Sequence, residues 1–149
     1  MPPRGRNQGP TMVPPITSRR MKAVRRDGTA PELLVRNRLR EKGFRFSTND
    51  RALPGSPDLA FQNNRVAVFV HGCFWHGHHD CRRARLPKTN EQFWRAKVAS
   101  NQKRDREKER SLRRKGWRVL ILWQCRIEAD AEAQVRRITT LLQRTDHAS

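Results

Sequence analysis

The sequence predicts a small α/β domain in which a mixed sheet of short strands is flanked by helices. Residues 66–70 and 119–123 form two short, wholly apolar runs, which is typical of strands in the interior of a sheet. Patterns with helical spacing come before, between and after these runs. The sequence shows no internal repeat, and its 149 residues suffice for one compact domain but not for two.

The predicted elements follow one another as an arm, a helix, three strands, a helix, a strand and a final helix. Turn sequences separate the early strands, because proline fixes φ, glycine allows a sharp reversal and paired asparagines favour a hairpin turn. Residues 72–87 are polar and rich in histidine and cysteine, and we expect a long loop there. The predicted bounds are 1–28 for the arm, 29–43 for the first helix, 44–47, 58–61 and 65–71 for the early strands, 90–115 for the long helix, 117–123 for the last strand and 128–144 for the closing helix.

The first helix begins with a capping box. Thr29 stands at the N-cap, Pro31 in the first turn and Glu32 at the third position, and Gly43 is the expected stop. We expect a mostly apolar face on this helix, with its arginines outside that face. The face comprises Leu33, Leu34, Asn37 and Leu39, and the arginines are Arg36, Arg38 and Arg40.

The charge of the chain predicts a polyanionic partner. Lys and Arg total 33 against 14 acidic residues, which gives a formal net charge of +19. No stretch approaches the ~20 apolar residues that a membrane span needs. The N-terminus also lacks the apolar region of a secretion signal. We therefore expect a cytoplasmic protein that binds nucleic acid and is neither secreted nor bound to a membrane.

Residues 1–28 are predicted to form a basic, proline-rich arm outside a folded domain of residues 29–149. The arm holds five of the nine prolines and seven Lys or Arg against one acid, so it buries too little apolar surface to fold alone. One interpretation is a disordered, solubilising tail. The net charge favours a second interpretation, in which residues 17–26 become ordered on a DNA backbone. Arg19, Arg20 and Lys22 are among the contacts that we expect there.

One metal site can explain all three cysteines. Cys73 and Cys81 flank a loop with several histidines, and Cys125 follows the last predicted strand. If that strand lies beside the preceding one, three thiolates and one imidazole form a closed tetrahedral Zn²⁺ site, which is structural because no position stays open for water. The spacing favours His79 as the fourth ligand, with His78 as the alternative. The competing interpretation is three unrelated buried cysteines beside surface histidines.

A second group of residues predicts catalytic chemistry. Asp58 directly follows a Pro-Gly-Ser-Pro turn at the start of a strand, where nucleases place carboxylates that hold Mg²⁺. His71 ends the next strand and His76 follows five residues later. An acid and two imidazoles can therefore converge where neighbouring strands end. The alternative is that Asp58 only caps its turn.

One face of the long helix carries further candidates. Lys97, Asn101 and Asp105 are spaced by four residues and so share a face, and Trp94 lies one turn before them. Lysine, asparagine and tryptophan can contact DNA bases, and Asp105 can orient a histidine as the third member of a relay. The alternative is a solvated charged face.

Phe74 and Trp75 are adjacent aromatic residues in the polar loop. Two neighbours in a loop cannot easily both point into a core. One function of exposed aromatic edges is to act as a wedge between base pairs. The alternative is that both rings pack under the zinc site.

The sequence resembles the very short patch repair endonucleases from about residue 17 to residue 128. The most specific part of the resemblance is the run His71-Gly72-Cys73-Phe74-Trp75-His76. Further matching segments are Arg20-Met21-Lys22-Ala23-Val24, Thr29-Ala30-Pro31-Glu32, Leu53-Pro54-Gly55-Ser56-Pro57-Asp58, Pro87-Lys88-Thr89, Phe93-Trp94, Asn101, Arg104-Asp105 and Gly116-Trp117-Arg118-Val119-Leu120. The resemblance implies a restriction-endonuclease-like fold with a divergent PD-(D/E)xK core. It also implies a strand-specific nick 5′ to the mispaired thymine of a T:G mismatch that arises from deamination of 5-methylcytosine.

The same resemblance implies two metals and a set of residue roles. Mg²⁺ would serve the chemistry at Asp58 and the main-chain carbonyl of Val70. Zn²⁺ would be structural, with Cys73, His79 (or His78), Cys81 and Cys125 as ligands. His71 would stabilise the scissile phosphate and His76 would activate the water, with Asp105 holding the ring of His76 and Glu32 at the edge of the site. The implied DNA contacts are Phe74, Trp75 and Trp94 as a major-groove wedge, Met21 in the minor groove, and Lys97 and Asn101 at the mispair.

The chain departs from ordinary restriction enzymes at the end of the second core strand. Those enzymes carry an acid and a lysine where this chain has Phe69 and His71, and Val70 replaces the threonine of some relatives, so only its main chain can bind a metal. A non-catalytic, zinc-stabilised DNA-binding module and a nickase with another mismatch or sequence preference are the alternatives. Because one nick needs one active site, we expect a monomer, with other repair proteins as further partners.

Overall fold

The computed structural model describes residues 29–148, with side chains described as far as residue 144. The predicted arm, residues 1–28, lies outside the described residues, and with it Arg19, Arg20, Met21 and Lys22. No helix in the described part of the chain is both long enough and apolar enough to span a membrane.

The sheet has four strands in the order β1-β2-β3-β4, and their bounds are Ser47–Thr48, Leu59–Phe61, Val66–His71 and Arg118–Trp123. β1 and β2 are antiparallel, as are β2 and β3, whereas β3 and β4 run parallel. The predicted mixed sheet is therefore confirmed. In the parallel pair His71 lies opposite Trp123, so the two strands end together.

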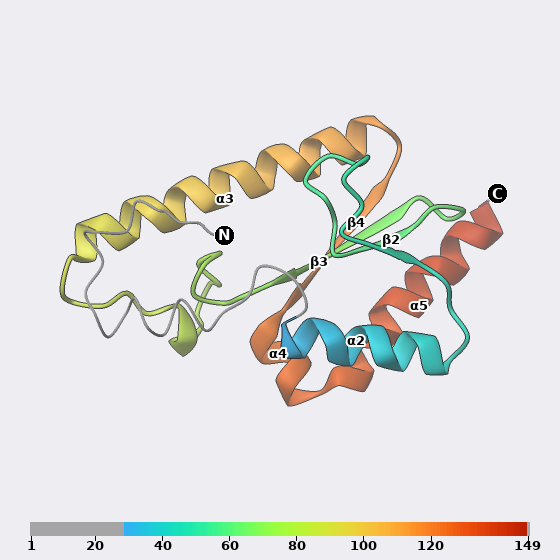
Figure 1. Ribbon diagram of the computed structural model, residues 1–149, viewed down its shortest axis with the longest axis horizontal. Helices are drawn as coiled ribbons and strands as arrows, with labels where there is room; N and C mark the ends of the chain where they lie inside the picture. The colour runs from blue at the N-terminus through green and yellow to red at the C-terminus, as the bar shows by residue number, and fades with distance from the viewer. Residues whose placement is uncertain (1–28, 149) are drawn as a thin grey trace, which may run out of the picture.

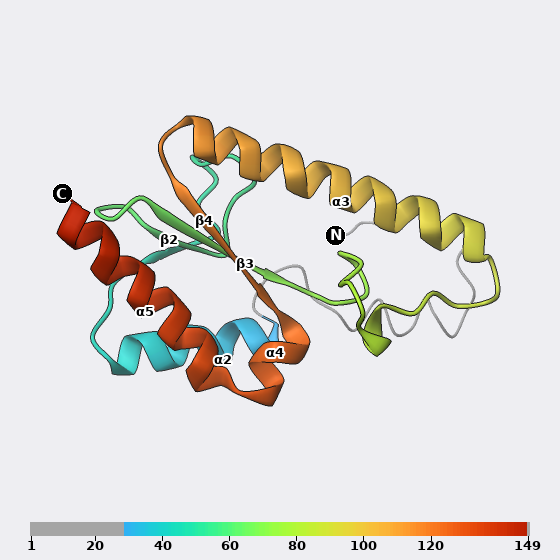
Figure 2. The same cartoon turned by 180° about the vertical axis from the view of Figure 1, so that it is seen from behind.

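Helices cover both faces of this sheet (Figures 1 and 2). One layer contains α2, α4 and α5, and the other contains α3, which runs past the edge of the sheet. The bounds are Ala30–Glu41 for α2, Glu91–Arg114 for α3, Gln124–Ala129 for α4 and Ala131–Ala148 for α5.

The side chains of β3 alternate between two apolar cores. Val66 and Val68 pack with α2, α4 and α5, whereas Ala67 and Phe69 belong to the core under α3. Because side chains along a strand point alternately to opposite faces, His71 falls on the α3 side. This alternation places the last residue of β3 between the sheet and the long helix.

The first helix has the predicted cap but a different buried face. Thr29 Oγ1 accepts a hydrogen bond from the backbone N–H of Glu32 at 3.4 Å, and Gly43 has a φ of +87° just after the helix. However, Leu33 is 42% exposed, whereas Arg36 is buried. The spacing of apolar residues did not predict this buried face, because the face includes a charged residue. Arg36 is buried as an ion pair with Glu32, one turn earlier.

Three element boundaries also differ from the prediction. The first strand is Ser47–Thr48 and not residues 44–47, because Phe44 and Phe46 pack against the core instead. A short 3-10 helix, η2 (Arg82–Ala84), lies in the expected loop. The closing helix is two helices, which are separated at Asp130, where the side chain accepts a hydrogen bond from the N–H of Ala133 at 3.1 Å and caps α5.

Candidate active site and cysteine cluster

Asp58 lies directly before β2, and its carboxylate is bonded to the neighbouring strand. The backbone N–H of Val70 donates to Oδ2 of Asp58 at 2.6 Å. The turn in front of Asp58 packs closely on α3, because a Cβ on Gly55 would lie 2.7 Å from the side chain of Lys108. Gly55 has a φ of +77°, which glycine adopts without steric cost. The turn and β3 together hold the carboxylate in place.

Burial raises the pKa of Asp58 to about 6. The Val70 N–H, the positive charge of Arg36, a hydrogen bond with Glu32 and the positive charge of His76 act in the opposite direction, in that order. Burial makes ionisation of the Asp58 carboxyl unfavourable. A cation bound to it would offset this cost, because an opposite charge favours the ionised form.

Glu32 and Arg36 form a buried ion pair next to Asp58. They lie one turn apart in α2, and the Glu32 side chain is 2% exposed. The hydrogen bond between Glu32 and Asp58 brings two carboxyl groups together. Oxygen ligands of this kind suit Mg²⁺, so the residues present fit the expected metal.

His71 and His76 stack face to face on the α3 side of the sheet. Their ring centroids are 3.8 Å apart and their planes lie 6° from parallel. Nδ1–H of His76 donates to Oδ2 of Asp105 in α3 at 2.6 Å. With Nδ1 as the donor, Nε2 is the acceptor of the neutral ring. This is the geometry expected if Asp105 orients His76.

The surroundings give these groups different protonation states. Burial, with a further contribution from the charge of His76, lowers the pKa of His71 to about 3, so His71 is neutral near pH 7. Burial acts to raise the pKa of Asp105, but the hydrogen bond and charge of His76 outweigh it and bring this pKa below its usual value. Asp105 is therefore ionised and can stabilise a protonated His76.

Cys73, His78, Cys81 and Cys125 form a compact cluster, with their ligand atoms all within 4.8 Å of one another. Sγ of Cys125 lies 3.4 Å from Nδ1 of His78, and the N–H of Cys125 donates to Sγ of Cys73 at 3.4 Å. Cys73 and Cys125 each lie two residues beyond the paired ends of β3 and β4. The parallel pairing therefore brings these two cysteines together.

The donor set of the cluster fits zinc. Three sulfurs and one imidazole nitrogen are the ligands of a closed tetrahedral zinc site. Burial, only partly offset by the N–H of Cys125, raises the pKa of the Cys73 thiol to about 12. A bound cation would replace the thiol protons. The prediction of a site that combines all three cysteines agrees with this geometry.

The expectation that His79 is the fourth member of the cluster is wrong. The His79 side chain is 94% exposed, and its Nε2 lies 3.2 Å from the carboxylate of Asp80. Gly77 has a φ of +61° and packs against Val98 and Gln102 of α3, where a Cβ would be too close. This turn aims His78 at Cys125 and leaves His79 in solvent.

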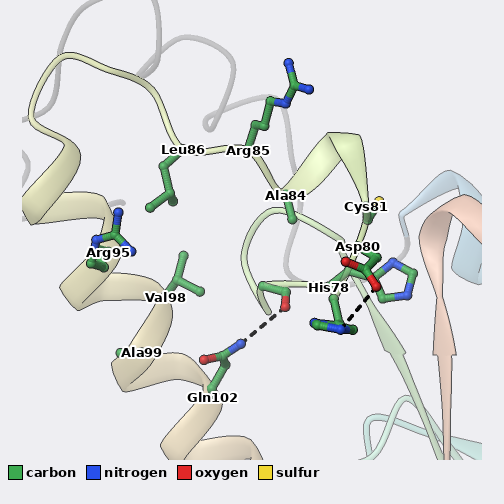
Figure 3. Close-up of a pocket in the computed structure, with 12 residues that line it drawn as sticks. His78, Asp80, Cys81, Ala84, Arg85, Leu86, Arg95, Val98, Ala99 and Gln102 are labelled. Atoms are coloured by element: carbon green, nitrogen blue, oxygen red, sulfur yellow. Dashed lines mark hydrogen bonds and ion pairs between the residues drawn. The ribbon is translucent and has the colours of Figure 1, made fainter.

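A pocket of about 460 Å³ lies between the loop and α3 (Figure 3). Its helix side includes Arg95, Val98 and Gln102, and its loop side includes His78 and Cys81. Nε2 of Gln102 donates to the carbonyl oxygens of two loop residues, at 3.1 and 3.3 Å, and ties the loop to the helix. The pocket borders the cysteine cluster, whereas Asp58 and the stacked histidines lie outside it.

Four aromatic rings from the loop and the first turn of α3 form a cluster. Phe74, Trp75, Trp94 and Phe93 have ring centroids 5.0 to 6.0 Å apart and steeply inclined planes. Trp94 is 2% exposed, whereas Phe93 is 39% exposed. The accessible part of the cluster therefore belongs to Phe74, Trp75 and Phe93, and Trp94 supports them from below.

Asn101 and Lys97 occupy the expected face of α3 in different ways. Nδ2 of Asn101 donates to the carbonyl oxygen of Trp75 at 3.0 Å, so Asn101 holds the aromatic loop on the helix. Lys97 is exposed.

Sequence reasoning missed four residues around the two sites, namely Arg36, Phe93, Gln102 and Trp123. Trp123 had a usable signal, because the expected pairing of the last two strands places it opposite His71. The spacing of apolar residues in the helix gave no signal for the inward orientation of Arg36. Gln102 contacts the loop through a side chain that spacing alone does not distinguish from its charged neighbours.

A buried carboxylate held by Val70, next along β3 to a stacked histidine pair of which one ring is hydrogen-bonded to Asp105, is suited to metal-assisted hydrolysis of a phosphodiester. Residues 13–83 match the family described as DNA mismatch endonuclease Vsr. The type II nicking enzyme V.XorIIP of Xanthomonas oryzae pv. oryzae is 44% identical over 79% of this chain and 88% of its own length.

Two more relatives extend this similarity. The DNA mismatch endonuclease Vsr of Escherichia coli (strain K12) is 36% identical over 85% of this chain and 80% of its own length. The type II nicking enzyme V.NaeI of Lentzea aerocolonigenes is 42% identical over 79% of this chain and 73% of its own length. The chain belongs to the Vsr family of DNA mismatch endonucleases. It is a DNA endonuclease, a hydrolase that acts on DNA.

Proposed function

We propose that this endonuclease makes a strand-specific nick 5′ to the mispaired thymine of a T:G mismatch and so starts very short patch repair of deaminated 5-methylcytosine. The observation that carries the proposal is that His71 and His76 stack beside Asp105 at the end of β3, where the N–H of Val70 also binds the carboxylate of Asp58. The sheet with helices on both faces is compatible with a restriction-endonuclease-like fold. We expect a monomer that acts on DNA in the cytoplasm, at the nucleoid, together with other repair proteins.

His76 is the general base in this proposal. Because Asp105 accepts a hydrogen bond from Nδ1–H, the lone pair of Nε2 is available to take a proton from the attacking water. The ionised Asp105 then stabilises the imidazolium that forms. His71 stays neutral, supports the ring of His76 from one face and offers a hydrogen bond to the scissile phosphate.

The carboxylate of Asp58 and the main-chain carbonyl of Val70 would hold Mg²⁺, with Glu32 at the edge of the site. Bound Mg²⁺ supplies positive charge for the phosphate oxygens as negative charge develops on them. The Val70 N–H holds one oxygen of Asp58 in place. The second carboxyl, Glu32, supports this assignment because it lies against the first.

The cysteine cluster would hold a structural Zn²⁺ through Cys73, His78, Cys81 and Cys125. Four protein ligands leave no open position, so this metal takes no part in the hydrolysis. Its contribution is to hold the loop that carries His76 and the aromatic residues.

DNA contacts in this proposal surround the catalytic groups. Phe74 and Trp75, with Trp94 behind them, would enter the major groove as a wedge, and Met21 would enter the minor groove. Unstacking costs least at a mismatch, so a wedge also selects the substrate. Lys97 and Asn101 would read the mispair, and Arg19, Arg20 and Lys22 would contact the phosphate backbone.

A panel of mispaired duplexes tests the proposal. Each strand is labelled separately, every mispair is placed in varied flanking sequence, and Mg²⁺ is present. We expect a nick only in the thymine strand of T:G duplexes, 5′ to the mispaired base. Equal cutting of other mispairs or of paired DNA would contradict the T:G assignment.

A nickase with another mismatch or sequence preference is the second candidate function. It is favoured by the relatives named type II nicking enzymes, whose names do not mention a mismatch. Membership of an endonuclease family excludes the non-catalytic DNA-binding module. In the same panel, the second candidate predicts cutting that follows flanking sequence more closely than mispair identity.

A further inference from the structure

Trp123, at the end of β4, touches one histidine of each site. Its indole stacks on the imidazole of His78, with centroids 4.1 Å apart and planes 8° from parallel. It also meets His71 edge to face, at 5.2 Å and 79°. Since His71 stacks on His76 at 3.8 Å, a continuous series of four rings connects the cysteine cluster to the catalytic histidines.

The backbone fixes Trp123 between the two sites. The residue lies opposite His71 in the parallel strand pair, and it is the N-cap residue of α4, two residues before Cys125. The segment from Trp123 to Cys125 therefore places an indole against His71 and a thiol in the cysteine cluster. A shift of this ring would disturb the end of the sheet, the start of α4 or both.

The chemistry of the rings favours this arrangement when metal is bound. A metal-bound imidazole is electron-poor, and the face of indole is the most electron-rich among the aromatic side chains. Metal binding would therefore strengthen the contact between His78 and Trp123 and fix the indole. The indole in turn limits the positions available to His71.

We infer that Trp123 is a positioning residue that couples the cysteine cluster to the catalytic histidines. As a ligand of a bound metal, His78 would be fixed in place and would fix Trp123, and Trp123 holds His71 and through it His76. The catalytic half of this inference rests on the proposed nicking activity, whereas the metal half rests only on the proposed Zn²⁺ site.

The test compares three variants of the full chain. Trp123→Leu removes the ring, and Trp123→Phe keeps a smaller one. Trp117→Leu is the matched control, because Trp117 is a buried tryptophan in the core under α3, with Leu112 and Phe69. Zn²⁺ affinity is measured by competition with a chromophoric chelator, and nicking of a T:G duplex is measured in single turnover at saturating enzyme.

We expect Trp123→Leu to lower Zn²⁺ affinity about fivefold and the single-turnover rate about tenfold, in line with the loss of one or two ring contacts. DNA affinity should change by less than about threefold, because the indole reaches DNA only through other residues. Trp123→Phe should restore most of both losses. Trp117→Leu should reproduce neither loss in folded protein, as judged by circular dichroism.

Wild-type Zn²⁺ affinity or a wild-type nicking rate in folded Trp123→Leu would overturn the coupling, and so would equal losses in Trp117→Leu. If Trp123→Leu does not fold, proton NMR of the wild-type protein decides. The ring current of the indole should place the His78 ring protons upfield of those of His79, and coincident positions would overturn the stack. A wild-type chain that does not nick T:G DNA contradicts the proposed function, and the Zn²⁺ affinities still decide the metal half.

Discussion

The carboxylate of Asp105 holds the ring of His76 from α3, with Nδ1 and Oδ2 2.6 Å apart, while the ring of His71 covers one face of His76. The two histidines are therefore not equivalent. His71 is buried and neutral, whereas the His76 side chain keeps 24% of its surface exposed. An oriented and accessible base beside a buried, neutral imidazole is the arrangement on which the proposed mechanism depends.

Asp105→Asn should slow nicking and leave DNA binding intact. The amide cannot stabilise a protonated His76 and also favours the wrong tautomer. We expect the single-turnover rate to fall about 100- to 1,000-fold and DNA affinity to change by less than about threefold. The exposed residue Glu107 on the same helix provides the control, Glu107→Gln, which should keep the wild-type rate. Equal losses of rate and affinity would contradict the orienting role.

Asp58→Asn should abolish nicking and stabilise the metal-free protein at neutral pH. The pKa of Asp58 is about 6 in the folded protein against an ordinary value of 3.8, so its folded form is favoured while the carboxyl is protonated. This favourable contribution of the protonated carboxyl to the free energy of unfolding is fully present below pH 3.8 and is lost as the pH rises through 6. At pH 7.5 the buried charge costs about 2–3 kcal/mol.

Urea denaturation with a chelator present measures this effect. The variant should exceed the wild type in unfolding free energy at pH 7.5, and the difference should vanish towards pH 4. A difference that does not change with pH would contradict the raised pKa of Asp58. The exposed variant Glu107→Gln should show no such dependence.

His78→Gln and His79→Gln should separate the metal ligand from its neighbour. The wild type and His79→Gln should each retain about one zinc per chain after dialysis. His78→Gln should bind zinc at least about 100-fold more weakly, because it replaces one of four ligands. Elemental analysis and chelator competition measure both quantities. Zinc loss in His79→Gln alone would contradict the placement of His78 in the cluster.

Arg36→Leu should be far more destabilising than Arg95→Leu. Both arginines pair with a glutamate one turn earlier in a helix, but the Arg36 side chain is 10% exposed and that of Arg95 67%. Loss of Arg36 leaves the buried Glu32 charge uncompensated, at about 3–5 kcal/mol. Loss of the surface pair should cost less than about 1 kcal/mol. Equal unfolding free energies would contradict this difference.

Binding to a T:G duplex should weaken steeply with salt. A net charge of +19 provides many phosphate contacts, each of which releases counterions. Between 50 and 200 mM salt we expect a loss of about 10³-fold in affinity. Deletion of residues 1–28 should flatten the dependence if the arm follows the backbone. A shallow slope in the full chain would contradict extensive phosphate contact.

Local chemistry predicted much of the fold. The apolar runs marked β3 and β4, the capping box marked the start of α2, and the spacing of acid, histidine and cysteine indicated two groups of side chains that lie together, the cysteine cluster and the group of His71, His76 and Asp105. These features depend on contacts between near neighbours or on the pairing of two adjacent strands. That pairing is enough to bring Cys73 to Cys125.

The errors arose where the path of a loop, the partner of a buried charge or a single cap decides the outcome. The path of the loop between Gly77 and Asp80, which both have positive φ, selects His78 over His79. The inward orientation of Arg36 depends on its charge partner and on Asp58, neither of which changes the apolar pattern of the helix. The end of a helix at Asp130 depends on a single cap.

The parallel pairing of β3 with β4 also sets the order of events during synthesis. His71 and Cys73 emerge from the ribosome early, but Trp123 and Cys125 follow about fifty residues later, after the whole of α3. The pairing of β3 with β4 cannot form until β4 has been made, since closing so long a segment requires both of its ends. A nascent or prematurely terminated chain that stops before β4 thus carries Asp58, His71 and His76 without the strand that completes the sheet beside them.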